Sequence, residues 1–380
     1  MSERVRPWSS VAVLSALLAF AGCGNFFQQT HGCGTCAAST FLFATQLNNI
    51  SGFTLSASGV PGPVGSLAGP NTSQGIVADK LASFLFVSDF QNGTVDAFTI
   101  NPTSGTLSAV SGSPFTAGTA PGAGGLAIDP STKFLYVTQV NSAAVAGFTI
   151  APGTGVLSPI PNSPFPAGNS PMQAVVDPLG KFLYVSDLND ANGGISAYTI
   201  DSTSGALTPV LGSPFPTQAN FPGPNHMAIG GGGKFLYVAM SGTVNANNSI
   251  SAFSIDPNSG ALTQISGSPF TTGNDPQGIA SDASGKFLYT ANSQDTTVSA
   301  FTIDSSSGML TAVSGSPFAT AAIPTGLAVD PNGQFLLVGQ AANNGLAGFN
   351  IDANSGGLSP ISGSPFSTSG QINGLAIAKP

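Results

Sequence analysis

One unit of about fifty residues recurs along the chain, and this repetition restricts the possible folds more than any other feature. Each copy contains a Phe-Leu block followed by three further strand residues. The seven blocks start at Phe41, Phe84, Phe134, Phe182, Phe235, Phe287 and Phe335. Successive starts are 43, 50, 48, 53, 52 and 48 residues apart. The chain is therefore interpreted as seven copies of one structural unit.

Each copy holds four short apolar segments of the kind that form strands. The Phe-Leu block is followed by a second apolar run, such as Val95–Ile100, and then by a Leu-x-x-Val or Leu-x-x-Ile segment, such as the one from Leu107. A fourth segment precedes the block, as in Gly326–Val329. Four strands per fifty residues match a propeller blade, and seven lies within the usual range of blade numbers. We predict an all-β, seven-bladed β-propeller of four-stranded antiparallel blades over residues 39–380.

The two ends of the repeat region complement each other. The chain finishes with Gly374–Ile377, a segment of the kind that precedes each Phe-Leu block, but no such block follows it. Phe41–Ala44 belongs to a Phe-Leu block, but no segment of the preceding kind stands before it. Joining the two would complete blade one from both termini and remove an exposed sheet edge. We therefore predict that the C-terminal strand closes the ring.

The composition agrees with many short strands joined by tight turns. With 41% hydrophobic residues and 26 Phe, the chain can bury a large core, which argues against disorder. The 49 Gly and 29 Pro interrupt every window that could sustain a long helix. Turns such as Asp177-Pro178-Leu179-Gly180-Lys181 combine an Asp that can bond the backbone, a Pro that fixes φ and a Gly for a left-handed position.

The charges exclude a nucleic-acid partner. Only 6% of residues are charged, and the only Glu and both Arg lie within the first six positions. Six Lys and fifteen Asp remain beyond them. Binding to phosphates needs clustered basic side chains, which this chain lacks.

Residues 1–22 have the features of an export signal. Arg4 and Arg6 supply the positive n-region, and Val11–Phe20 is an apolar stretch too short to span a bilayer. Small residues then precede Cys23, as in a bacterial lipobox, so we expect lipidation of Cys23 and a lipoprotein held in the cell envelope by its lipid anchor alone. An ordinary secretory signal with an incidental Cys is the alternative.

Residues 23–38 are predicted to form a tether that carries a Cys-x-x-Cys pair. Outside the cytoplasm, Cys33 and Cys36 are expected to form a local disulfide or to have no function. Metal binding with His31 would offer three ligands where a structural zinc site needs four. We expect no cofactor and no metal.

The repeat also separates scaffold residues from candidate site residues. Nine Asp and four Lys recur in turns, and nineteen Phe recur in strands or in Ser-Pro-Phe motifs. Six Asp remain: Asp89, Asp96, Asp187, Asp190, Asp275 and Asp295. All except Asp96 lie on connections at the face opposite the Lys-bearing hairpins, so these five are candidate substrate-binding residues. The segment from Asp187 to Asn192 could offer oxygens to Ca²⁺, but a polar turn is favoured because the glycine and final acidic ligand of a calcium loop are missing.

His226 is the one histidine within the repeats. It stands at the start of an innermost strand, where the other copies are taken to have small residues: Gly125, Ala174, Gly278, Gly326 and Gly374. Because that strand would line the central channel, His226 is expected near its mouth. It is either a general base for attack of water on an acyl carbon or a histidine satisfied by backbone contacts.

The stretch Gly223-Pro224-Asn225-His226-Met227-Ala228-Ile229 and the hairpin Gly233-Lys234-Phe235-Leu236-Tyr237-Val238 carry a family resemblance. Together they resemble the Gly-Pro-Arg-His motif and the Asp-Gly-Lys-x-Leu-Tyr-Val hairpin of the seven-bladed lactonase propellers, which include 6-phosphogluconolactonase. Phe287–Asn292 is also similar to the tyrosine-valine-threonine-asparagine surface propellers. The resemblance implies a lactone hydrolase with His226 as its catalytic residue.

Asn225 replaces the family's arginine, and no arginine follows residue 6. Because Asn cannot reproduce charge-assisted contacts with a phosphate, we expect a neutral lactone, with Asn225 among the binding residues. The alternative is a non-catalytic envelope propeller that binds a glycan, a peptide or a partner protein through its Asn-rich face. In either case we expect a monomer.

Overall fold

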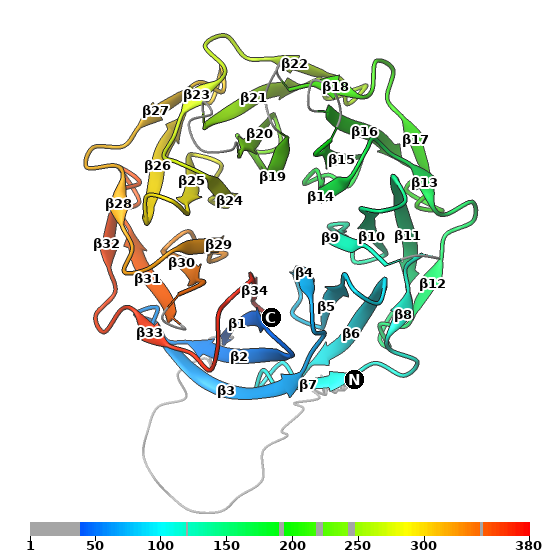
Figure 1. Ribbon diagram of the computed structural model, residues 1–380, viewed down its shortest axis with the longest axis horizontal. Coiled ribbons are helices and arrows are strands. Elements are labelled where there is room, and N and C mark those ends of the chain that lie inside the picture. The colour runs from blue at the N-terminus through cyan, green and yellow to red at the C-terminus, as the bar shows by residue number, and fades with distance from the viewer. Residues whose placement is uncertain (1–38, 119–120, 190–193, 218–222, 242–247, 343–344) are drawn as a thin grey trace, which may run out of the picture. The chain divides into compact units, whose positions relative to one another are not determined.

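The computed structural model describes residues 39–118, 121–189, 194–217, 223–241, 248–342 and 345–380. These residues form seven antiparallel sheets that are arranged as blades around a central axis (Figure 1). The predicted seven-bladed β-propeller is thereby confirmed. None of the described residues belongs to a helix long and apolar enough to cross a membrane.

The strands follow the same order from the axis outwards in each blade. Blade one consists of β34 (Gly374–Ala378), β1 (Thr40–Gln46), β2 (Asn49–Leu55) and β3 (Pro61–Ala68). The innermost strands of blades two to seven are β4 (Ser73–Ala78), β9 (Ala123–Ile128), β14 (Pro171–Val176), β19 (Pro224–Gly230), β24 (Pro276–Ser281) and β29 (Pro324–Val329). The second strands are β5 (Phe84–Asp89), β10 (Phe134–Gln139), β15 (Phe182–Asp187), β20 (Phe235–Met240), β25 (Phe287–Asn292) and β30 (Phe335–Gln340). The third strands are β6 (Thr94–Ile100), β11 (Ala144–Ile150), β16 (Gly194–Ile200), β21 (Ser249–Ile255), β26 (Thr297–Ile303) and β31 (Gly345–Ile351).

The outermost strand of blades two to seven is divided into two pieces, which the four-strand prediction does not include. Both pieces pair with the third strand. The first pieces are β7 (Leu107–Ala109), β12 (Leu157–Pro159), β17 (Leu207–Pro209), β22 (Leu262–Gln264), β27 (Leu310–Ala312) and β32 (Leu358–Pro360). The second pieces are β8 (Phe115–Thr116), β13 (Phe165–Pro166), β18 (Phe215–Pro216), β23 (Phe270–Thr271), β28 (Phe318–Ala319) and β33 (Phe366–Ser367).

The repeated Ser-Pro-Phe motif explains this division. In blade two, the Ser113–Pro114 peptide is cis, and the Ser113 hydroxyl accepts a 2.9 Å hydrogen bond from the Ala97 amide of the third strand. The serine therefore replaces a backbone partner at the point where the outer strand is interrupted. The same 2.9 Å bond is made by Ser163, Ser213, Ser268, Ser316 and Ser364.

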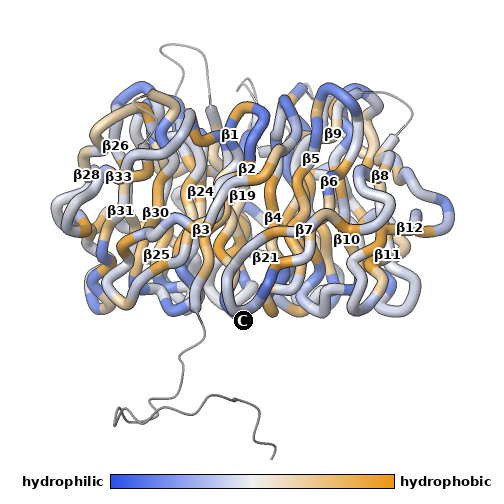
Figure 2. The backbone as a smooth tube through the Cα atoms, turned by 90° about the horizontal axis from the view of Figure 1, so that it is seen from below, coloured by the Kyte–Doolittle hydropathy of each residue, from blue (hydrophilic) through white to orange (hydrophobic). Residues whose placement is uncertain are grey.

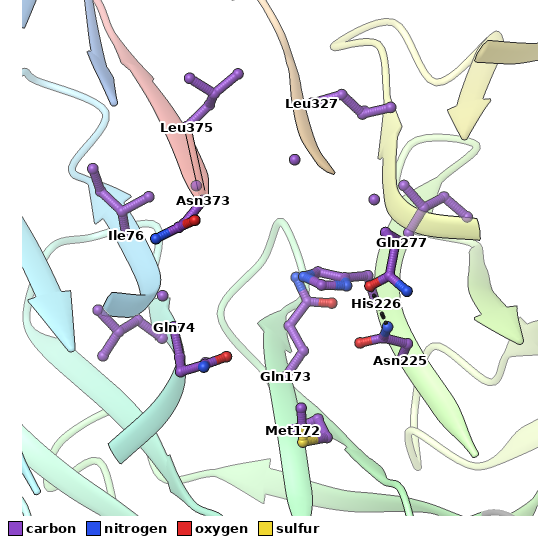
Figure 3. A pocket seen from close by; sticks show the side chains of 17 residues that line it. Gln74, Ile76, Met172, Gln173, Asn225, His226, Gln277, Leu327, Asn373 and Leu375 are labelled. Carbon is purple, nitrogen blue, oxygen red and sulfur yellow. Dashed lines mark hydrogen bonds between the residues drawn. The ribbon is translucent and has the colours of Figure 1, made fainter. Parts of the chain in front are cut away.

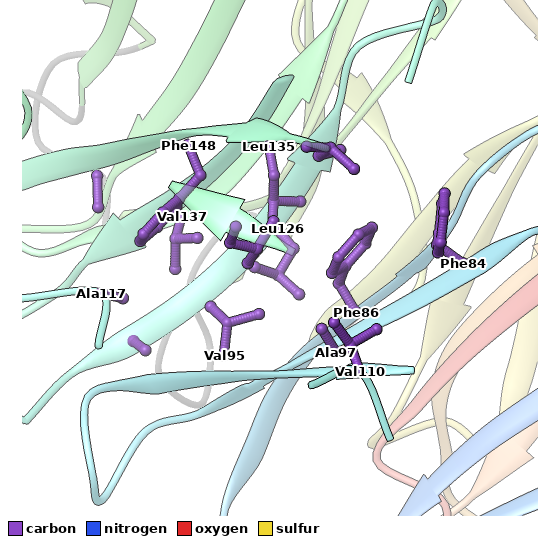
Figure 4. Close-up of a cluster of buried hydrophobic side chains, with 14 residues drawn as sticks. Phe84, Phe86, Val95, Ala97, Val110, Ala117, Leu126, Leu135, Val137 and Phe148 are labelled. Atoms are coloured by element: carbon purple, nitrogen blue, oxygen red, sulfur yellow. The ribbon is translucent and has the colours of Figure 1, made fainter. Parts of the chain in front are cut away.

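The hydrophobic core lies between neighbouring blades. Figure 4 shows one cluster, in which Phe86 of β5 packs with Leu126 of β9 and Val137 of β10. Corresponding clusters fill the other interfaces between blades. Burial of this apolar surface is the main force that holds the blades together. Hydrophilic segments gather at the two faces of the ring, where the turns lie (Figure 2).

The Asp that recurs in the repeat holds the hairpins between first and second strands by hydrogen bonds to backbone amides. Asp177 Oδ1 accepts hydrogen bonds from the amides of Lys181 (2.6 Å) and Phe182 (2.7 Å), which fixes the start of β15. Blade five lacks this Asp, and its turn is formed by Gly231, Gly232 and Gly233 at positive φ.

The C-terminal strand closes the ring as predicted. β34 pairs antiparallel with β1, in the register Phe43 with Ala376 and Thr45 with Gly374. Ala376 and Ala378 are buried in the hydrophobic cluster between blades one and two. This pairing joins the two ends of the propeller by backbone hydrogen bonds.

Candidate functional site

A pocket of about 260 Å³ lies at the centre of the ring and is lined by the innermost strands of all seven blades (Figure 3). Its polar side chains are five carboxamides and one imidazole: Gln74, Gln173, Asn225, Gln277, Asn373 and His226. No Asp, Glu, Lys or Arg lines it among the described residues. The pocket therefore offers hydrogen bonds to a ligand and no formal charge.

The strand register corrects the expected alignment of the copies around His226. Met227 of β19 pairs with Val238, and Ala174 of β14 pairs with Val185, the equivalent residue of its own blade. Ala174 therefore corresponds to Met227, and Gln173 corresponds to His226. The expectation that Ala174 is the counterpart of His226 was wrong by one residue.

All five other copies have glycine at this position, and at three of them, Gly75, Gly125 and Gly278, the backbone of the neighbouring innermost strand approaches closely. A Cβ added to Gly125 would lie 2.7 Å from the Met172 carbonyl oxygen, and one added to Gly278 would lie 2.7 Å from the Thr325 carbonyl oxygen. In blades four and five, the ring accommodates the side chains of Gln173 and His226 at this position instead. Aligning the repeats on the proline that starts four of the innermost strands, β14, β19, β24 and β29, would have singled out Gln173 from the sequence.

Gln173 and His226 each interact with the following blade. Gln173 Oε1 accepts a short hydrogen bond from the amide of Met227, the residue after His226. His226 is close enough to β24 for a hydrogen bond with the backbone of Gln277. The two side chains therefore fix the spacing of β14, β19 and β24 on both sides of the imidazole.

The imidazole of His226 is held in its neutral form. Burial lowers its pKa to about 4, although the hydrogen bond with the Gln277 backbone acts in the opposite direction. Its Nδ1 is buried and has no hydrogen-bond partner among the described residues. A neutral imidazole has one nitrogen able to accept a proton, which is the state that a general base requires.

Asn225 belongs to a chain of hydrogen bonds that leads away from the pocket. Its Nδ2 donates to Gln277 Oε1 over 3.1 Å, and Gln277 Nε2 donates to Asp275 Oδ1 over 2.7 Å. The structure thus brings together three of the residues singled out from the sequence: Asn225, His226 and Asp275. Gln277, which connects two of them, was not singled out because no local pattern marks it.

None of the candidate aspartates among the described residues lines the central pocket. Asp89 ends β5 and accepts hydrogen bonds from Thr72 and Asn92, which makes it part of a turn. Asp187 ends β15 and accepts from the amide (3.0 Å) and hydroxyl (2.7 Å) of Ser196. The carboxylate of Asp295 accepts from the backbone and side chain of Asn274.

Asp96 and Asp89 line a separate pocket of about 340 Å³ between blades one and two. Burial, and secondarily the charge of Asp89, raises the pKa of Asp96 to about 6. The described residues contain no group of three or more His, Cys, Asp or Glu that could hold a metal ion. Asp190, Cys23, Cys33 and Cys36 lie outside the described residues, so the predictions made for them stay predictions.

The comparisons with known proteins agree with this architecture. The family model described as "Lactonase, 7-bladed beta-propeller" matches residues 75–229 and 216–322. These ranges cover more than half of the chain and include the strand that carries Asn225 and His226. The chain belongs to the seven-bladed β-propeller lactonase family.

Solved structures share the fold at low sequence identity. A candidate 6-phosphogluconolactonase from Bacteroides fragilis is 20% identical, with a TM-score of 0.76 over 91% of this chain and 99% of that chain. One from Bacteroides uniformis is 19% identical, with a TM-score of 0.77 over 90% and 99%. The periplasmic gluconolactonase of Pseudomonas aeruginosa is 20% identical, with a TM-score of 0.73 over 90% and 99%. No curated protein sequence matches the chain.

Proposed function

We propose that the protein hydrolyses a neutral lactone in the central pocket. The observation that carries this proposal is His226, the one titratable side chain in the described lining, which burial keeps neutral at physiological pH. Membership of the lactonase family and the gluconolactonase activity named for the Pseudomonas aeruginosa relative support the same reaction class.

The proposed reaction needs a base and a hydrogen-bond donor. His226 accepts a proton as the water oxygen bonds to the lactone carbonyl carbon, and negative charge develops on the carbonyl oxygen. The N–H groups of the pocket carboxamides, such as Gln173, are available to stabilise that charge. The ring C–O bond then breaks, and the imidazolium returns its proton to the leaving oxygen, which yields a hydroxy acid.

The pocket favours an uncharged substrate. Its described lining contains no cation that could pair with a phosphate, and Asn225 stands where the family motif has arginine. Carboxamides pair well with sugar hydroxyls because each offers both a donor and an acceptor. We therefore propose a hydroxylated neutral lactone rather than a phosphorylated one.

A non-catalytic binding propeller is the second candidate. The buried, unpartnered Nδ1 of His226 favours it, because that nitrogen is closed to a substrate in the described structure. In this case the carboxamide side chains of the pocket bind a glycan, a peptide or a partner protein without turnover.

A panel of neutral lactones, including D-glucono-1,5-lactone, separates the two candidates. We expect the purified protein to hydrolyse at least one lactone and expect His226→Ala to lower kcat by about a hundredfold, a typical contribution of a general base. His226→Gln is the matched variant, because it keeps a polar side chain but removes the base. No turnover across the panel favours the binder, and full activity in both variants refutes the role of His226.

We further propose that the protein is exported, lipidated at Cys23 and monomeric. The signal-like residues 1–22 support export, and the Pseudomonas aeruginosa structural relative is a periplasmic protein. A clickable fatty acid should label the wild type in cells and should not label Cys23→Ser. Labelling of both proteins, or of neither, would contradict lipidation at Cys23.

A further inference from the structure

The hydrogen-bond chain that begins at Asn225 ends at a carboxylate outside the pocket. Asp275 precedes β24 and is not part of the pocket lining. Besides the bond from Gln277, it accepts a short bond from the Ser241 hydroxyl and a 2.5 Å bond from the Ser293 hydroxyl. All three hydrogen-bond partners of this carboxylate among the described residues are donors, so its oxygens act only as acceptors.

The carboxylate determines the direction of both amides. An amide can present either its oxygen or its nitrogen to a neighbour, and only the nitrogen can donate to Asp275. Gln277 must therefore turn its nitrogen to Asp275 and its oxygen to Asn225. Asn225 must in turn give its nitrogen to Gln277, which leaves Oδ1 on the other side of the amide. Figure 3 shows the Asn225 oxygen turned away from Gln277.

Gln173 lies on the opposite side of His226, and its amide is engaged through the oxygen, whereas the Asn225 amide is engaged through the nitrogen. The Gln173 oxygen accepts from the Met227 amide, so its nitrogen remains the end that can donate to a ligand. The imidazole is thus flanked by an acceptor from Asn225 and a donor from Gln173. A ligand that fits both must offer a donor at one end and an acceptor, such as a carbonyl oxygen, at the other.

We propose that Asp275 is a positioning residue that sets the ligand preference of the pocket: through Gln277 it makes Asn225 an acceptor for a ligand hydroxyl. The proposal deepens the proposed function and rests on it for the catalytic measurement. A site whose acceptor is fixed discriminates against an analogue that lacks the hydroxyl, because the acceptor then stays unpaired.

The first test compares a hydroxylated with a plain lactone. We expect the ratio of kcat/KM for D-glucono-1,5-lactone to that for δ-valerolactone to fall about tenfold in Asp275→Asn, because Asn can also present a donor and frees both amides to turn. Gln277→Met, which interrupts the chain without changing Asp275, should lower the ratio equally. Asp256→Asn in an exposed hairpin is the control for lost charge and should leave the ratio unchanged.

A rescue variant distinguishes orientation from mere structural support. In Asp275→Asn combined with Asn225→Asp, the carboxylate moves to the pocket end of the chain. Gln277 can then donate to residue 225 and accept from residue 275, so an acceptor again faces the ligand. We expect the preference for the hydroxylated lactone to return. An unchanged ratio in Asp275→Asn, or a folded double variant without rescue, overturns the proposal.

Binding of two lactams separates failure of this proposal from failure of the proposed function. D-Gluconolactam and δ-valerolactam match the two lactones but resist hydrolysis, and calorimetry measures their Kd. If the protein prefers gluconolactam without hydrolysing any lactone, the hydrolase assignment fails and the variants are compared by Kd ratio. If it binds neither lactam and hydrolyses neither lactone, the proposed preference is also refuted.

Discussion

His226 differs from a solvated histidine because the folded ring keeps it neutral. Burial lowers its pKa to about 4, whereas an unfolded chain would return it to about 6.5. Between these two values the unfolded chain binds a proton that the folded chain does not bind. Stability must therefore fall as the pH falls through this window.

This linkage predicts a difference between the wild type and His226→Gln that needs no substrate. Gln does not titrate, so the variant should lose less stability than the wild type when the pH is lowered from about 7 to about 4. The difference in Tm, wild type minus variant, should become more negative across that range in thermal unfolding followed by circular dichroism. Parallel Tm curves would show that the folded and unfolded states bind the proton equally well.

At the scale of strands and hairpins, buried tyrosines connect four of the seven blades to the next blade. Tyr184 of β15 donates a 3.0 Å hydrogen bond to the carbonyl oxygen of Gly260, in the outer hairpin of the following blade. Tyr136, Tyr237 and Tyr289 make the same bond to Gly205, Gly308 and Gly356. The Phe-Leu-Tyr segment is evident in the sequence, but its partner, 76 residues away from Tyr184, is not.

Tyr184→Phe should therefore destabilise the protein without changing its fold. Phe86 occupies the equivalent position of β5, which shows that the smaller ring is accommodated there. Loss of the buried bond leaves the Gly260 carbonyl unpaired and should cost about 1–2 kcal/mol in urea unfolding. Thr199→Val is the matched control, since it removes an exposed 3.3 Å bond to Thr208 and should cost much less. Equal costs would mean that burial adds nothing to the tyrosine bond.

At the scale of the whole molecule, ring closure depends on five residues at the C-terminus. β34 supplies the innermost strand of blade one and covers the edge of β1. Without it, β1 would expose unpaired backbone groups and a part of its apolar core.

Deletion of residues 374–380 should destabilise the entire propeller and lower Tm by many degrees in calorimetry. Deletion of residues 379–380 alone is the control, because it leaves β34 complete and removes only the exposed bond from Lys379 to Asn332. Unchanged thermal unfolding of the longer deletion would show that the ring does not need this closure.

The sequence by itself determined the blades, their number and the closure of the ring. These features depend on alternating apolar residues and on Asp and Gly in turns, which act over a few neighbouring positions and are repeated in copy after copy. The divided outer strand escaped prediction because the Ser113 hydroxyl bonds to a strand sixteen residues away.

Only the tertiary structure decided how the candidate site is assembled. Gln173, His226 and Gln277 are about fifty residues apart in sequence, and the ring places them side by side at its centre. The one-residue error at Ala174 arose because small residues look equivalent until strand pairing fixes the register. The direction of the Asn225 amide depends on Gln277 and Asp275, which the neighbouring blade contributes, and no local pattern of residues around Asn225 contains that information.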